Sequence, residues 1–88
     1  MKLTKIYVGS NNTTKELEIT KIHEVCGWYL EGFTIIQAQG YWKGEKENSA
    51  IIEYYGDRNN EDLFSALKGE LSQESLLVAV FITETNFI

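Results

Sequence analysis

Residues 33–55 read FTIIQAQGYWKGEKENSAIIEYY, and this stretch decides the fold. Both of its ends are rich in β-branched and aromatic residues, which favour strands, and a charged segment with a glycine separates them. The pattern predicts a hairpin in which a strand over 33–42 turns through 43–48 and returns as a strand over 49–55. Two large aromatics, two lysines and two glutamates crowd around the turn. It is therefore either a solvated tip or the rim of a binding site.

On each side of this hairpin the sequence predicts one helix and one strand. Upstream, residues 14–29 carry apolar side chains at helical spacing, and residues 3–9 read as a first strand. Downstream, Asn60 followed by two acids marks the start of a second helix, and residues 74–83 form the most apolar strand. The apolar stripe of the second helix consists of Leu63, Phe64, Leu67 and Leu71.

The element order β-α-β-β-α-β predicts a fold of the α+β class. Two right-handed crossovers that flank a hairpin give the ferredoxin-like split βαβ arrangement, a four-stranded antiparallel sheet with both helices on one face. Eighty-eight residues are too few to divide into two cores, so we expect a single domain over residues 1–88.

The strand pattern also predicts a partner for the sheet face that no helix covers. Such a face is polar in a monomer, yet here it is apolar, with Leu77, Phe81 and Ile51 on it and Glu53 as the main exception. Leaving three such side chains in water forgoes about 1.5–3 kcal/mol each, against a total stability of about 5–15 kcal/mol. We therefore expect a homo-oligomer whose open sheet faces pack together.

Composition restricts the class of protein. Thirteen acids against eight bases give a net charge of −5, which argues against general nucleic-acid binding. One cysteine and one histidine build neither a disulfide nor a structural zinc site, so we expect no metal and no cofactor. The longest apolar run, residues 76–82, is far shorter than the roughly 20 residues of a membrane helix. These features predict a soluble, cytoplasmic protein.

The chain lacks the common catalytic and nucleotide-binding motifs, so candidate site residues come from the hairpin and the segment before the last strand. The segment VGSNN (8–12) reads as an ordinary βα loop, with anion binding by its free amides as the alternative. Amides beside a sheet need partners, which a subunit boundary or a ligand supplies. We expect a ligand site formed by Gln39, Tyr41, Trp42, Lys43, Lys46, Glu47, Gln73 and Glu74.

These same residues resemble a family of small bacterial and phage proteins of uncharacterised function with a PII-like ferredoxin fold. The shared pattern is an apolar strand ending in A-x-G-x-W, a basic turn, E-x-S before the next strand and Q-E-S before the last. It spans residues 33–80, and its matching residues are Ala38, Gly40, Trp42, Glu47, Ser49, Gln73, Glu74 and Ser75. The resemblance implies a trimer with small-molecule sites in the clefts between subunits, near the hairpin.

The sequence more weakly resembles phage S-adenosylmethionine lyases, which are also PII-like trimers. Their glycine corresponds to Gly40, their base to Lys43 and their acid to Glu47, but Trp42 stands where they have a tyrosine. In that family the tyrosine hydroxyl and the acid act on the substrate. Indole has no hydroxyl, whereas its flat face suits a purine or a sulfonium.

Three functions follow from this reading. The favoured one is a non-catalytic homotrimer that holds a nucleotide-like molecule between subunits, with Tyr41 or Trp42 stacking on the base and Lys43 and Lys46 meeting phosphate. A phage protein of this kind would sequester a nucleotide signal of host defence. The alternative is a lyase acting on S-adenosylmethionine, with Glu47 or Glu74 as base or charge stabiliser. The third is an interaction module that binds a protein by its hairpin or strand edge.

Overall fold

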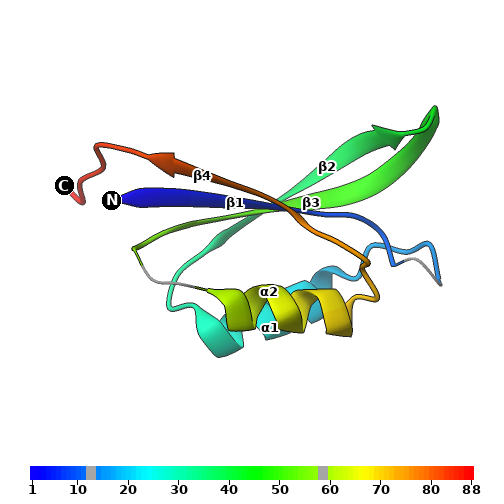
Figure 1. Ribbon diagram of the computed structural model, residues 1–88, viewed down its shortest axis with the longest axis horizontal. Coiled ribbons are helices and arrows are strands. Elements are labelled where there is room, and N and C mark those ends of the chain that lie inside the picture. The colour runs from blue at the N-terminus through cyan, green and yellow to red at the C-terminus, as the bar shows by residue number, and fades with distance from the viewer. Residues whose placement is uncertain (12–13, 58–59) are drawn as a thin grey trace.

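The computed structural model describes residues 1–11, 14–57 and 60–88, and the side chain of Trp42 lies outside what it describes. Over these residues the chain forms four strands and two helices in the predicted order (Figure 1). The elements are β1 (Lys2–Val8), α1 (Ile19–Tyr29), β2 (Thr34–Trp42), β3 (Glu45–Tyr55), α2 (Glu61–Glu70) and β4 (Leu77–Ile82).

The strands form one antiparallel sheet in the order β2-β3-β1-β4. Helices α1 and α2 pack side by side, and both lie on the same face of the sheet (Figure 1). This is the ferredoxin-like split βαβ arrangement, because each helix connects strands that are not neighbours in the sheet. The fold predicted from the sequence is therefore confirmed.

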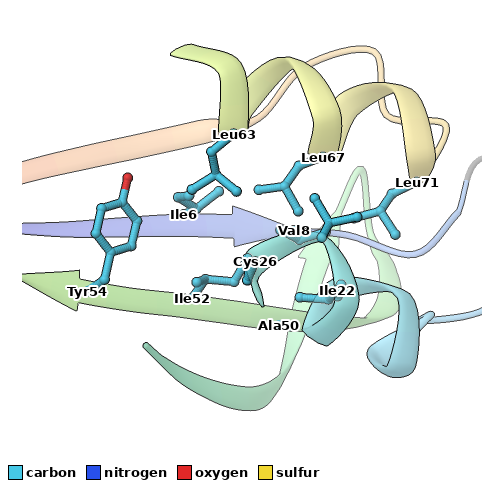
Figure 2. Packing of buried hydrophobic residues seen from close by; sticks show 11 residues of the cluster. Ile6, Val8, Ile22, Cys26, Ala50, Ile52, Tyr54, Leu63, Leu67 and Leu71 are labelled. Atoms are coloured by element: carbon cyan, nitrogen blue, oxygen red, sulfur yellow. The ribbon is translucent and has the colours of Figure 1, made fainter. Parts of the chain in front are cut away.

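The hydrophobic core lies between the sheet and the helices. Along β1 and β3, alternate side chains are buried, so Ile6 and Ile52 pack beneath the helices while Tyr7 and Ile51 turn to the opposite face. Figure 2 shows side chains from α1, α2 and the two strands converging in this layer. The core consists of Ile6, Val8, Ile22, Val25, Cys26, Ala50, Ile52, Tyr54, Leu63, Leu67 and Leu71.

The predicted hairpin turn over 43–48 is too long. Lys43 and Gly44 have left-handed backbone angles, with φ of 51° and 81°, and they alone connect β2 to β3. A two-residue turn of this hand matches the twist of the flanking strands, so pairing continues to Trp42 and Glu45. Strand β3 consequently begins at Glu45 rather than at residue 49, and Glu47 is a strand residue.

Two other predicted boundaries are wrong. Helix α1 begins at Ile19 rather than at residue 14, because Lys15 has a left-handed φ of 64° and its amide bonds back to the Asn11 carbonyl at 2.8 Å. Strand β4 begins at Leu77 rather than at residue 74. Ser72, with a φ of 51°, prevents the chain from continuing helix α2, and the residues from there to Leu77 form a loop.

Candidate ligand-binding pocket

A pocket lies at the end of the sheet where β1 stops, and Tyr7, Glu47 and Ser49 of the uncovered face are part of its lining. Three segments enclose it: the end of β1, the β2–β3 hairpin, and the loop between α2 and β4. Its volume is about 400 Å³. The lining residues are Tyr7, Val8, Gly9, Ser10, Gly40, Tyr41, Glu47, Ser49, Gln73, Glu74 and Ser75.

Strand register explains why hairpin residues reach this pocket. Glu47 pairs with Gly40, and two positions further on Ser49 pairs with Ala38, so Glu47 and Ser49 lie on the same sheet face. Ala50, the next residue along β3, is fully buried under the helices. Because successive side chains of a strand alternate, Ser49 and Glu47 lie on the face that no helix covers. Because Gly40 has no side chain, the space opposite Glu47 stays open.

Hydrogen bonds at Ser10 fix the three segments relative to one another. The side-chain amide of Gln73 donates through Nε2 to the Ser10 carbonyl at 2.8 Å and to the Leu71 carbonyl at 3.3 Å. The Ser10 hydroxyl donates to the Asn48 carbonyl at 2.7 Å. The loop before β4 and the first residues of β3 are thus both tied to the end of β1.

The chemistry of the pocket is acidic and rich in hydrogen-bond acceptors. The half-buried carboxylate of Glu47 lies against Gly9, beside the Gln73 side-chain oxygen, and Glu74 adds a second, exposed carboxylate. Among the described residues that line the pocket, none is a lysine or an arginine. Since the Gln73 Nε2 group already donates to backbone carbonyls, its Oε1 is the atom available to a ligand.

The structure brings together four of the eight residues that the sequence predicts for the site: Tyr41, Glu47, Gln73 and Glu74. The other four do not line this pocket or lie outside what is described. Gln39 pairs with Asn48 and is exposed, Lys43 lies in the two-residue turn, and Lys46 is exposed opposite Tyr41. Trp42 belongs to β2, and its side chain is not described.

The sequence did not predict Tyr7 of β1 as a site residue, and it considered Gly9 and Ser10, which follow β1, only as part of the VGSNN loop. The signal was present, because strand alternation places Tyr7 on the same face as Ser49. The anion-binding alternative for VGSNN gains no support, since a carboxylate lies against Gly9. Asn12 of that segment lies outside the described residues.

Two groups with a raised pKa lie in the core and not in the pocket. Burial raises the pKa of the Cys26 thiol to about 11. Burial also raises the pKa of the Tyr54 hydroxyl, which accepts a hydrogen bond from Asn60 at 3.0 Å.

Within the described parts of the chain, no group of three or more His, Cys, Asp or Glu side chains could hold a metal ion. No described helix combines the length and apolarity needed to cross a membrane.

Comparison with known proteins establishes the fold. No family model and no curated protein sequence matches the chain. Among solved structures it is similar to a phage SAM lyase in the apo state, with a TM-score of 0.66 and 19% identity over 91% of this chain and 78% of that one. It is also similar to a DUF3240 family protein from Shewanella baltica OS155, with a TM-score of 0.68 and 12% identity over 99% and 94% of the two chains.

A third similar structure is CutA1 from Oryza sativa, with a TM-score of 0.50 and 17% identity over 98% of this chain and 84% of that one. At these identities the similarity is one of fold. The predicted ferredoxin-like fold is confirmed, and the resemblance to phage lyases that the sequence suggested is found again in the fold.

Proposed function

We propose that this protein binds a small nucleoside-like molecule with a positive charge, of which S-adenosylmethionine is the type, in the pocket at the end of β1. The observation that carries the proposal is the Glu47 carboxylate, held against Gly9 beside the Gln73 side-chain oxygen. A volume of about 400 Å³ falls within the range of small-molecule sites. The acceptors suit ribose hydroxyls and an ammonium, and the carboxylates suit a sulfonium.

The charge of the pocket argues against a phosphate-bearing ligand. At an effective dielectric constant of 20, one carboxylate about 5 Å from a phosphate charge repels it by about 3 kcal/mol, and attracts a sulfonium by the same amount. Both Glu47 and Glu74 line the pocket, whereas Lys43 and Lys46 do not. The expected contact of these lysines with phosphate is therefore not part of the proposal.

A second copy of the chain completes the site in this proposal. Tyr7 lines the pocket and also belongs to the uncovered sheet face, where it pairs with the exposed Leu77. A copy packed on that face buries these side chains and supplies a further wall beside them. The resemblance to PII-like proteins favours three copies.

A competing function is lyase activity on S-adenosylmethionine. The observation that favours it is that the Glu47 carboxylate and the Gln73 side-chain oxygen both lie at Gly9, in a chain whose fold is similar to that of a phage SAM lyase. Glu47 would serve as base or charge stabiliser. The substitution of the family's tyrosine by Trp42 favours binding without turnover.

Calorimetry with matched ligands tests binding. We expect S-adenosylmethionine to bind and ATP not to bind. S-adenosylhomocysteine lacks the sulfonium charge and should bind at least about tenfold more weakly than S-adenosylmethionine. Glu47→Gln should weaken the sulfonium ligand about tenfold and its neutral analogue much less. Glu45→Gln is the matched control, because Glu45 lies on the same strand outside the pocket. Tighter binding of ATP than of S-adenosylmethionine would overturn the proposal.

Incubation with S-adenosylmethionine separates the two functions. Chromatography of the mixture should show unchanged ligand if the protein only binds. Release of methylthioadenosine, lost in Glu47→Gln and retained in Glu45→Gln, would establish the lyase instead. Native mass spectrometry of the same sample counts the subunits and any retained ligand.

A further inference from the structure

Gly9 is a glycine whose backbone does not require one. It lies directly after β1, and its φ is not positive, in contrast to Gly44 and Gly56. The left-handed φ that favours glycine is therefore not the reason for a glycine here. The space around Gly9, and not its backbone angle, explains a glycine at this position.

That space is occupied by the acidic group of the pocket. A Cβ atom built on Gly9 would collide with Oε1 of Glu47, and it would lie 3.2 Å from the Glu47 carboxyl carbon and 3.6 Å from Oε1 of Gln73. The Glu47 carboxylate thus fills the volume that the side chain of any other residue would take. The atom that must move is the end of a flexible side chain and not backbone.

Two hydrogen bonds of the neighbouring Ser10 hold the segments around Gly9 together. The neighbouring Ser10 accepts a hydrogen bond from Gln73 and donates one to the Asn48 carbonyl, next to Glu47 in the chain. These bonds hold the residue after Gly9 next to the loop that carries Gln73 and the strand that carries Glu47. A change at Gly9 acts on the carboxylate while the hydrogen bonds of Ser10 remain.

We propose that Gly9 is the positioning residue of the pocket: its missing side chain leaves the place in which the Glu47 carboxylate rests, beside Oε1 of Gln73. Gly9 need not touch the ligand to do this. The inference rests on the proposed function for its effect on binding, and on the geometry alone for its effect on Glu47. Gly9 then determines ligand charge preference through a residue on another strand.

The test is a double-mutant cycle between Gly9→Ala and Glu47→Ala, read by calorimetry with S-adenosylmethionine. Gly9→Ala should weaken binding about tenfold or more, because displacement of a charged group by about 1 Å is costly in a preorganised site. In the Glu47→Ala background the same change should have no further effect, since no carboxylate remains to be displaced. Gly27→Ala is the control, because a Cβ at Gly27 meets nothing within 4 Å.

Folding and carboxylate position are measured on the same variants. Circular dichroism should show native Gly9→Ala protein, and the Glu47 side-chain carboxyl resonance in NMR should shift while that of Glu45 does not. Wild-type affinity in Gly9→Ala, an equal loss in the Glu47→Ala background, or an unmoved Glu47 resonance would each overturn the inference. If the wild-type protein binds no probe, the proposed function fails, and the Glu47 resonance still decides on Gly9.

Discussion

The two faces of the sheet are similar in sequence and opposite in environment. On the face beneath the helices, Ile6 and Ile52 have no exposed surface (Figure 2). On the other face, Leu77 is 68% exposed and Phe81 is 48% exposed in the single chain. Strand alternation sends successive side chains to opposite faces of the sheet. A strand with apolar residues at successive positions therefore has two apolar faces, and the helices cover only one of them.

The uncovered face differs from the core in carrying charge. Lys5 and Glu53 form an ion pair at 3.4 Å between the exposed apolar side chains, and the Lys5 ammonium lies 6.0 Å from the centre of the Phe81 ring. A partner that covered this face would bury the pair, which penalises a purely apolar partner. The helix-covered face therefore serves folding, while the uncovered face is suited to selective association next to the pocket.

Truncating one leucine on each side of the sheet gives the largest expected difference. Leu67→Ala, in the core, should lower the free energy of unfolding by about 2–5 kcal/mol, because a buried side chain is lost and a cavity remains. Leu77→Ala should lower it by less than about 1 kcal/mol in dilute protein. Urea denaturation at nanomolar concentration measures both, and equal losses would contradict the contrast between the faces.

A charge on the uncovered face should separate association from folding. Leu77→Glu is expected to yield a monomer with native circular dichroism, since an oligomer would have to bury an unpaired carboxylate. The control is Ile82→Glu on the same strand, because Ile82 is also exposed but alternates to the other side. Sedimentation equilibrium distinguishes them. A wild-type monomer at micromolar concentration, or dissociation by both variants alike, would contradict the proposed packing of open faces.

The element order and the two-faced pattern could be predicted from sequence because they depend on local periodicity. The boundaries could not, because they depend on single residues with left-handed backbone. Lys43, Lys15 and Ser72 each adopt a positive φ although none is a glycine, and each one moves the end of an element. The residue type does not predict this conformation, because most lysines and serines avoid a positive φ.

The candidate site was predicted only in part, for a related reason. Glu47 and Gln73 were visible as polar residues flanking apolar strands. Their meeting at Gly9 depends on the two-residue turn, which puts Glu47 on a strand, and on the loop that brings Gln73 to Ser10. The lysines were expected at the ligand because they are near it in sequence. Lys46 pairs with Tyr41 across the hairpin, but it is not among the residues that line the pocket.

A predicted change of stability with pH tests how well the helix-covered face excludes water. Burial raises the pKa of the Cys26 thiol to about 11, from an ordinary value of 9.0. Between these pH values the unfolded chain loses this proton while the folded chain keeps it, so stability must fall as the pH rises from about 9 to 11. Two pH units correspond to at most about 3 kcal/mol at the upper end. Urea denaturation across this range measures the slope.

Cys26→Ala isolates the thiol from the other groups that titrate at high pH. The variant loses some stability at every pH because a buried sulfur is removed, but its slope between pH 9 and 11 should be shallower than that of the wild type. Tyr54, whose raised pKa adds a slope of the same sign, is present in both proteins, but the charge of Cys26 is one of the causes that raise it, so that part of the Tyr54 slope is lost together with the thiol. Identical slopes would mean that water reaches the thiol, and the contrast between a dry and a wet face of the sheet would then be weaker than the exposed areas indicate.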